Sequence, residues 1–106
     1  MFTPAKFFVN EPTDSVAESL QGLCMTNPAI TSLSTHPTCI IQSSTSSQVS
    51  LLSGGGSGHE PSHCGFVGDG MLHGAVCGGM FASPSVDQIL STIIATSAPP
   101  AARAAS

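Results

Sequence analysis

A glycine-rich segment at residues 53–61 constrains this chain more than any other feature. It holds four glycines within five positions, and His59 and Glu60 follow directly. A residue without a Cβ lets the backbone approach a small polar ligand, and it permits the positive φ angles that turn several N–H groups towards one point. The preceding residues, 48–52, predict a short buried strand. We therefore expect residues 53–58 to form an irregular loop at the end of a strand, where α/β sheets usually bind ligands.

Two segments have the periodicity of amphipathic helices. The first opens with Ser15 and Glu18, which are spaced as a capping box, and it stops before Asn27 and Pro28. The second opens with a similar box, Ser85 and Gln88. We expect the apolar face of each helix to pack in the core: Val16, Leu20, Leu23 and Cys24 in the first, and Val86, Ile89, Leu90, Ile93 and Ile94 in the second.

Short apolar runs between these helices predict strands. We expect strands at residues 39–41 and 71–77, a short helical turn at residues 30–33, and turns at residues 43–47 and 68–70. Helices interleaved with short strands indicate the α/β class. The predicted fold is an incomplete sheet with flanking helices over residues 1–96, followed by an Ala-, Pro- and Ser-rich tail at residues 97–106 that we expect to be disordered.

The scarcity of charge limits the partners of this chain. Only 8% of its 106 residues are charged, against roughly 25% in ordinary soluble domains. We interpret the deficit as surface that is normally covered, by further chain or by a partner. The only cationic residues are Lys6 and Arg103 and the net charge is −4, so we expect neither nucleic acid nor an anionic membrane surface as a partner.

The cysteines and the absence of targeting patterns bear on the compartment. No signal peptide pattern occurs at the start, and no apolar run is long enough for a transmembrane helix. The four cysteines, Cys24, Cys39, Cys64 and Cys77, show no Cys-x-x-Cys spacing. We therefore expect a cytoplasmic protein with reduced thiols, and a disulfide pair is the alternative.

Two common motifs resemble the glycine-rich segment but fail in detail. A Walker loop ends in Gly-Lys-Ser or Gly-Lys-Thr, whereas Gly58 is followed here by His59 and Glu60. The dinucleotide fingerprint needs a third glycine where this chain has His59 or Pro61. A nucleotide loop is therefore disfavoured.

A zinc hydrolase is a distant alternative. Residues 59–63 satisfy His-Glu-x-x-His through His59, Glu60 and His63, and a third ligand would be His73, Cys64 or Cys77. That chemistry needs a helix, because helical geometry brings residues i and i+4 to one face. The glycines before His59 and the proline inside the motif disfavour such a helix.

A third interpretation rests on a resemblance. Residues 51–61 read Leu-Leu-Ser-Gly-Gly-Gly-Ser-Gly-His-Glu-Pro, and they are followed by His63, by Gly-Phe-Val-Gly at residues 65–68 and by Phe-Ala-Ser-Pro-Ser at residues 81–85. The series closely resembles the N-terminal signature of the dihydroxyacetone (glycerone) kinase family, with similarity over roughly residues 6–96. Two departures are Cys64, where alanine is common, and Gly79, where an acidic residue is often seen.

The resemblance implies a substrate and roles for individual residues. Members of the family phosphorylate dihydroxyacetone, and some also phosphorylate glyceraldehyde. The resemblance implies that the keto-diol is bound by Gly56, Ser57, Gly58 and His59. His59 is then the expected catalytic residue, hydrogen-bonding the substrate and acting as a general acid or base. The histidines at 36 and 73 are expected to take no part.

Residues next to the binding loop are expected to support it. By the same resemblance, Glu60 braces the loop and His63 lies just behind it. No metal ligand is expected among these residues. Family members are often homodimers.

The resemblance also implies that a working kinase needs more than these 106 residues. In the family, a second histidine far downstream holds the substrate covalently, and a lysine and an aspartate after the last helix touch it. ATP with Mg²⁺ binds to a separate helical domain or to a partner chain. None of these parts is in this sequence. We therefore expect a fragment that binds neither ATP nor Mg²⁺ and is inactive alone, or alternatively a non-catalytic module that binds a triose or a partner.

Overall fold

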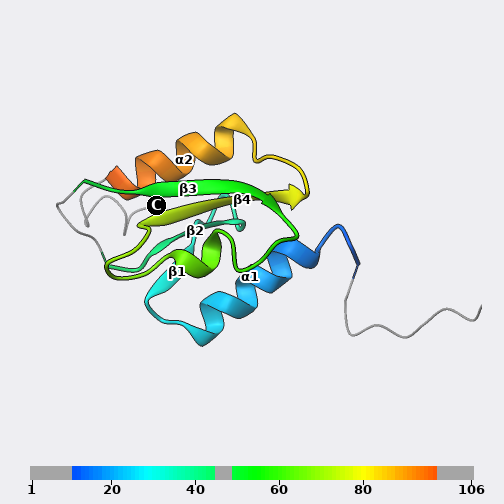
Figure 1. Ribbon diagram of the computed structural model, residues 1–106, viewed down its shortest axis with the longest axis horizontal. Coiled ribbons are helices and arrows are strands. Elements are labelled where there is room, and N and C mark those ends of the chain that lie inside the picture. The colour runs from blue at the N-terminus through cyan, green and yellow to red at the C-terminus, as the bar shows by residue number, and fades with distance from the viewer. Residues whose placement is uncertain (1–10, 45–48, 98–106) are drawn as a thin grey trace, which may run out of the picture.

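The computed structural model describes residues 11–44 and 49–97. Within them, a four-stranded sheet lies between two helices, α1 (Ser15–Thr26) and α2 (Val86–Ser97), on its opposite faces (Figure 1). This arrangement confirms the predicted α/β class with flanking helices. Helix α2 extends to Ser97, and the rest of the expected tail, including Arg103, lies outside the described residues. Lys6 also lies outside them. Among the described residues, neither helix has the length and apolar character that crossing a membrane requires.

The sheet is mixed, with strand order β1-β2-β4-β3. Its strands are β1 (Ile30–Ser32), β2 (Cys39–Gln42), β3 (Leu52–Ser57) and β4 (Gly74–Met80). Strand β2 is antiparallel to both β1 and β4, whereas β3 runs parallel to β4. The carboxyl ends of β3 and β4 therefore lie at the same edge of the sheet, and the loops after both strands meet there.

The glycines form a strand rather than an irregular loop. Strand β3 begins at Leu52 and pairs with β4 through the glycines, with an irregularity in register between Gly55 and Ser57. The prediction of a strand at residues 48–52 was therefore wrong for residues 49–51, and residue 48 lies outside the described part. The strands approach closely, because a Cβ on Gly54 would stand 2.5 Å from the carbonyl oxygen of Val76. Only glycine fits at such a distance, so Gly54 is required for this pairing of the strands.

The other strands differ more modestly from the prediction. The strand expected at residues 39–41 is confirmed as β2, and the turn at residues 68–70 is confirmed by the bond from the N–H of Met71 to the carbonyl of Gly68 (3.0 Å). Strand β4 starts three residues later than expected and continues through the glycines at 78 and 79. Residues 45–47 of the expected polar turn lie outside the described residues.

Residues 30–32 form strand β1, so the helical turn expected there was wrong. The side-chain oxygen of Asn27 accepts a hydrogen bond from the N–H of Ala29 (3.0 Å), which turns the chain away from the axis of α1. Ile30 is then buried and its backbone pairs with Gln42 in β2. A buried apolar side chain on paired backbone outweighs the local preference for a turn.

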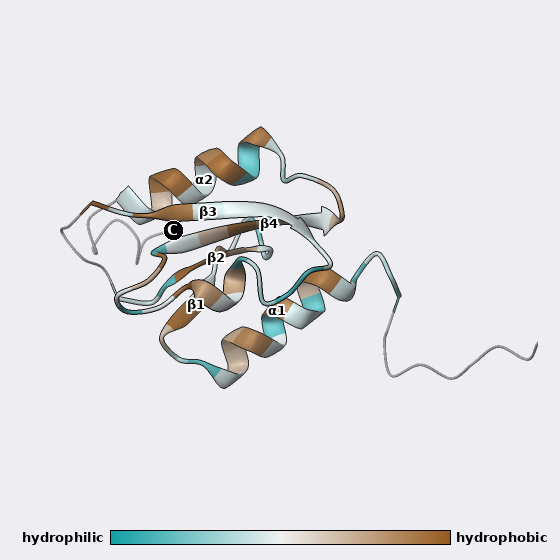
Figure 2. Cartoon of the chain, in the orientation of Figure 1, coloured by the Kyte–Doolittle hydropathy of each residue, from teal (hydrophilic) through white to brown (hydrophobic). Residues whose placement is uncertain are grey.

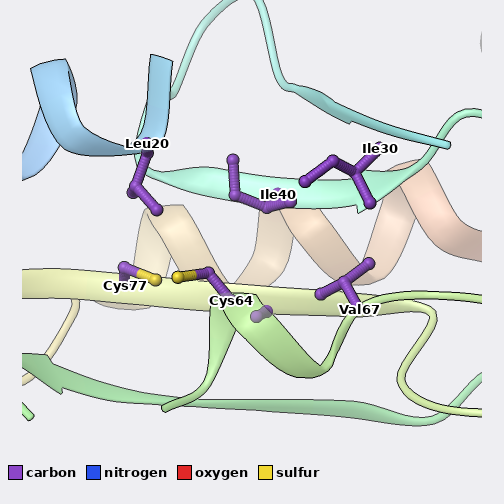
Figure 3. Close-up of a cluster of buried hydrophobic side chains, with 7 residues drawn as sticks. Leu20, Ile30, Ile40, Cys64, Val67 and Cys77 are labelled. Atoms are coloured by element: carbon purple, nitrogen blue, oxygen red, sulfur yellow. The ribbon is translucent and has the colours of Figure 1, made fainter. Parts of the chain in front are cut away.

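The core lies between α1 and the sheet. Figure 3 shows side chains from α1, from the sheet and from the short 3₁₀ helix η1 (Cys64–Phe66) converging on one cluster. The buried members are Leu20, Ile30, Ile40, Cys64, Val67, Ala75 and Cys77, and Val16, Leu23, Cys24 and Leu72 pack against them. The predicted apolar face of the first helix is therefore confirmed as the face that packs against the core.

The N-cap of α1 lies one residue before Ser15, which was predicted to open a capping box. Asp14 is the N-cap, and its side chain makes no capping hydrogen bond. Ser15 is already the first helical residue, and its hydroxyl donates to the carbonyl of Pro12 (2.8 Å). The predicted end of the helix at Asn27 is confirmed.

Helix α2 has the predicted capping box. The N–H of Ser85 donates to Oε1 of Gln88 (2.8 Å), and the N–H of Gln88 donates to Oγ of Ser85 (3.2 Å). Two N–H groups that have no partner within a helix are thereby satisfied, which fixes the start of α2.

The apolar stripe of α2 faces outward, so its prediction as core was wrong. Thr92 and Thr96 are the residues buried against the sheet, at 0% and 3% exposure, and their hydroxyls are satisfied by carbonyls of α2 itself. The space beneath the helix is narrow, because a Cβ on Gly74 would lie 3.2 Å from the methyl of Thr96. Figure 2 shows the hydrophobic residues along α2, and those left exposed are Val86, Ile89, Leu90, Ile93 and Ile94.

Candidate ligand-binding loop at the ends of β3 and β4

The loop at residues 58–63 leaves the carboxyl end of β3 beside the end of β4. The N–H of Phe81 donates to the carbonyl of Ser57 (2.7 Å), which holds the two strand ends together. A Cβ on Gly56 would stand 2.9 Å from the backbone nitrogen of Ala82. The candidate loop is therefore fixed at its root by close backbone packing.

Ser57 is part of this root. Its side chain is 2% exposed, and its hydroxyl donates to the carbonyl of Gly78 (2.9 Å). The hydroxyl is thus engaged within the sheet and does not face solvent. Ser57 was expected to bind the ligand, but its side chain instead links the start of the loop to β4.

Gly58 turns the chain out of the strand. Its φ is +116°, a conformation that residues with a Cβ rarely adopt. The ring of Phe81 covers it, because a Cβ on Gly58 would stand 2.6 Å from that ring. Phe81 itself has φ +52° and is 80% exposed. Strained, exposed aromatic residues at a loop are candidates for a functional position.

His59 and Glu60 follow on the outer part of the loop, and both are exposed. Oε1 of Glu60 accepts a hydrogen bond from the N–H of Gly58 (3.2 Å), which closes a small ring around His59. The imidazole of His59 stands edge-to-face against that of His63, with ring centroids 5.9 Å apart and an interplanar angle of 87°. His59 therefore lies exposed on a braced loop.

His63 links the loop to β3. Its Nδ1 and the hydroxyl of Ser53 are 3.0 Å apart and share one hydrogen bond, in which either partner can donate. A Cβ on Gly55 would lie 3.7 Å from Nε2 of His63, so this ring packs over the glycine strand. The structure thus brings Gly56, Ser57, Gly58, His59, Glu60 and His63 together at one edge of the sheet.

The two remaining histidines are engaged elsewhere. Nε2 of His36 lies 2.8 Å from a carboxylate oxygen of Asp87, at the start of α2. Nδ1 of His73 accepts a hydrogen bond from the N–H of Leu51 (3.0 Å), before the start of β3. Neither residue contacts the loop through these bonds.

The segment that matches His-Glu-x-x-His is a series of turns, not a helix. Its two histidines meet edge-to-face and so do not project in parallel from one helical face. Within residues 11–44 and 49–97, no group of three or more His, Cys, Asp or Glu side chains is arranged to hold a metal ion. The geometry that a zinc hydrolase needs is not formed by these residues.

A shallow groove lies on the α2 side of the sheet. Its volume is about 380 Å³, and its apolar lining comes from Leu52, Val76, Pro84, Ile89 and Ile93. It does not include His59 or Glu60. With few polar groups to orient a small hydroxylated ligand, it is a weaker candidate than the loop for that purpose.

The chain is an α/β domain in which a braced glycine–histidine loop lies at the ends of two parallel strands. The profile of the Dak1 domain matches residues 21–101. The chain belongs to this family, the Dak1 domain of dihydroxyacetone kinases.

Two similar proteins are a dihydroxyacetone kinase and a subunit of such a kinase. The chain is 52% identical over 83 residues to dihydroxyacetone kinase 1 of Saccharomyces cerevisiae, covering 78% of this chain and 14% of the relative. It is 46% identical over 86 residues to the dihydroxyacetone-binding subunit DhaK of a PTS-dependent dihydroxyacetone kinase of Lactococcus lactis, covering 80% of this chain and 26% of that subunit. The chain therefore spans about a quarter or less of the length of these relatives.

A solved structure agrees with the fold. The crystal structure of dihydroxyacetone kinase from C. freundii in complex with AMP-PNP and Mg²⁺ matches with a TM-score of 0.79 and 41% identity. The match covers 88% of this chain and 18% of that one. The chain thus corresponds to a small part of a larger kinase fold.

Proposed function

We propose that this chain supplies the dihydroxyacetone-binding part of a glycerone kinase, with His59 as the residue that contacts the substrate. The observation that carries the proposal is the braced loop, with an exposed imidazole, in a chain that is 52% identical over 83 residues to a dihydroxyacetone kinase. A small ligand with two hydroxyls and one carbonyl needs a few convergent donors and acceptors, which this loop offers.

His59 hydrogen-bonds one hydroxyl of the keto-diol in this proposal. An imidazole both accepts and donates protons near neutral pH, so it removes the hydroxyl proton as phosphate is transferred to that oxygen. The ring of His63 packs against His59 and limits its orientation. Pre-orienting a general base in this way lowers the entropic cost of reaching the reactive geometry.

The N–H of Gly58 is a second contact point in the proposal. It donates to Glu60 here, at 3.2 Å, which is long for a hydrogen bond to a carboxylate. A substrate oxygen competes with Glu60 for this donor, while Gly56 and Ser57 form the floor beneath it. Glu60 therefore keeps the loop in shape and gives way when the ligand binds.

The described residues do not fit Mg²⁺-ATP. Residues 11–44 and 49–97 contain no lysine or arginine to neutralise a triphosphate, and the strand-to-helix Walker loop is absent from them. In the C. freundii kinase, whose structure contains AMP-PNP and Mg²⁺, this chain matches only 18% of the length. The phosphate donor is therefore bound by parts beyond the residues described.

Calorimetric titration tests the binding proposal. Dihydroxyacetone added to the 106-residue chain is expected to bind at a single site with a dissociation constant in the millimolar range or below. Glycerol serves as the control, since it has the hydroxyls without the carbonyl, and it is expected to bind more weakly. Equal dissociation constants for the two compounds would argue against a site built for the keto-diol.

The purified chain is expected to show no phosphate transfer from ATP to dihydroxyacetone. The physical reason is the lack of groups that hold a triphosphate among the described residues. A coupled assay that detects ADP measures this, with the full-length C. freundii enzyme as the positive control. Turnover by the chain itself would show that it contains a donor site.

A non-catalytic binding module is the second candidate. The similarity to a relative named as a dihydroxyacetone-binding subunit favours it, because binding and donor functions are then on separate chains. Both candidates predict the same calorimetric result. Phosphorylation that appears when a donor component from a relative is added would distinguish the kinase part from a module that only binds.

A further inference from the structure

Two of the four cysteines face each other in the core. Cys64 is the first residue of η1, and Cys77 lies on β4, against which η1 packs. Figure 3 shows the two sulfur atoms pointing towards each other between α1 and the sheet. Both side chains are buried, at 5% and 4% exposure, and both are free thiols. The pair is therefore close and enclosed, and it is not crosslinked.

The other two cysteines are placed differently. Cys39 lies on β2 with its side chain on the opposite face of the sheet, where its thiol donates to the carbonyl of Gln88 in α2 (3.6 Å). Cys24, on α1, is only partly buried and packs at the margin of the cluster. The sheet thus separates Cys39 from the pair, and Cys24 is the only competing partner that shares their side.

The pair has the electrostatics of a reactive dithiol. The hydrogen bond with Cys77 lowers the pKa of the Cys64 thiol to about 7, against the opposing effects of burial and of the Glu60 carboxylate. The same hydrogen bond, together with burial, raises the pKa of Cys77. Burial, followed by the charge of Cys64, raises the pKa of Cys24. This direction favours Cys64 over Cys77 as the attacking thiol, because the thiolate is the form that attacks a disulfide.

We propose that Cys64 and Cys77 form a thiol–disulfide exchange site that takes a small-molecule disulfide as oxidant. The thiolate of Cys64 attacks one sulfur of the small disulfide, which breaks that bond and releases one thiolate. The sulfur of Cys77, after losing its proton to solvent, attacks the mixed disulfide at Cys64 and releases the second small thiol. One disulfide is consumed, two small thiols leave, and one bond joins η1 to β4.

The bond would act directly on the ligand-binding loop. Cys64 follows His63, whose ring contacts His59 and shares a hydrogen bond with Ser53. Joining Cys64 to β4 fixes this end of the loop to the sheet. The inference itself rests only on the arrangement of the cysteines, and it holds or fails independently of the proposed substrate.

Mapping the bond in the native chain tests the proposal. The chain is treated with glutathione disulfide, its remaining thiols are alkylated, and it is cut with cyanogen bromide and chymotrypsin. Cleavage after Leu33, Leu52 and Met71 puts the four cysteines on four different fragments. We expect the fragments of Cys64 and Cys77 to be linked, an intact mass lower by two hydrogen atoms, and full reversal by dithiothreitol.

Two variants complete the test. Cys64→Ala is expected to abolish the linked fragment, whereas Cys24→Ala, the matched control, is expected to keep it. Circular dichroism confirms that each variant is folded before treatment. A link between Cys24 and Cys64, a stable glutathione adduct without a link, or a native wild-type chain that does not react while the urea-unfolded chain does would each overturn the proposal.

Discussion

Replacing Gly54 with alanine is expected to disrupt the pairing of β3 with β4 and to remove more than half of the chain's stability. The new Cβ would stand 2.5 Å from the carbonyl oxygen of Val76 and 3.1 Å from its Cβ, both on the paired strand. Backbone atoms in a sheet cannot yield without loss of hydrogen bonds, so we expect a cost of about 3 kcal/mol. That is a large part of the stability of a small domain, which is about 5 kcal/mol. Urea unfolding followed by circular dichroism measures the loss.

The neighbouring glycine provides the matched control. A Cβ on Gly55 would meet nothing nearer than the ring of His63, at 3.7 Å, an ordinary contact. Gly55→Ala is therefore expected to change the free energy of unfolding by less than about 1 kcal/mol. Equal losses for the two variants would contradict the register in which Gly54 pairs with Val76.

Substituting Gly22 with alanine is expected to raise the free energy of unfolding, whereas the substitution at Gly54 lowers it. Gly22 lies within α1, and a Cβ there would have no neighbour within 4 Å. Gly22→Ala is expected to stabilise the chain by about 0.5–1 kcal/mol, because alanine loses less conformational entropy in a helix. Comparing the three variants therefore separates the effect of a steric clash from the effect of glycine on backbone entropy.

Replacing His59 with alanine is expected to weaken dihydroxyacetone binding about tenfold. The side chain is exposed and makes only an edge contact with His63, so its loss leaves the fold intact. In the proposal it contributes a hydrogen bond to the ligand, worth about 1–1.5 kcal/mol, which corresponds to roughly tenfold in affinity. Calorimetric titration compares the dissociation constants of the variant and the wild-type chain.

His36→Ala is the control for this experiment. It removes a histidine that pairs with Asp87 at the start of α2, on a different part of the molecule. The affinity of this variant for dihydroxyacetone is expected to stay within about twofold of the wild type, because His36 bonds to Asp87 and not to the loop. An unchanged affinity in the His59 variant would remove His59 from the site.

Local patterns predicted those elements whose cause is local. The capping box at Ser85 and Gln88 depends only on residues three positions apart, and the structure forms it with both hydrogen bonds. The strand at residues 39–41 is a buried apolar run, and the end of α1 follows from Asn27 and Pro28. The resemblance to dihydroxyacetone kinases was carried by a specific run of residues, and the family match confirms it.

Features decided by contacts between distant segments were not predictable in this way. The glycines at residues 54–56 have low strand propensity, yet they form β3, and at Gly54 the paired strand β4 approaches too closely for any side chain. Periodicity located the apolar stripe of α2 but could not show which face meets the sheet. Thr92 and Thr96 are small enough for the narrow space there. Burial of their hydroxyls is tolerated because each donates a hydrogen bond to a carbonyl of α2.

The same distinction applies to the candidate site. The sequence placed the six expected residues near one another, because five of them are consecutive and His63 follows closely. It did not show that the hydroxyl of Ser57 is engaged by Gly78, since that strand is distant in sequence. Phe81 was not predicted as part of the site. Its positive φ and its position over Gly58 depend on how the two strand ends meet, and no local pattern signals them.

The most direct test of the central claim is a residue-by-residue titration of the ¹⁵N-labelled chain with dihydroxyacetone by NMR. The account predicts saturable shifts of the amides of Gly56, Gly58 and His59 and of the His59 ring, with the signals of Ile89 and Ile93 unchanged. Shifts confined to Ile89 and Ile93 would move binding to the apolar groove between β3 and α2. No shift of the loop signals at millimolar dihydroxyacetone would contradict the proposal that this loop binds the substrate.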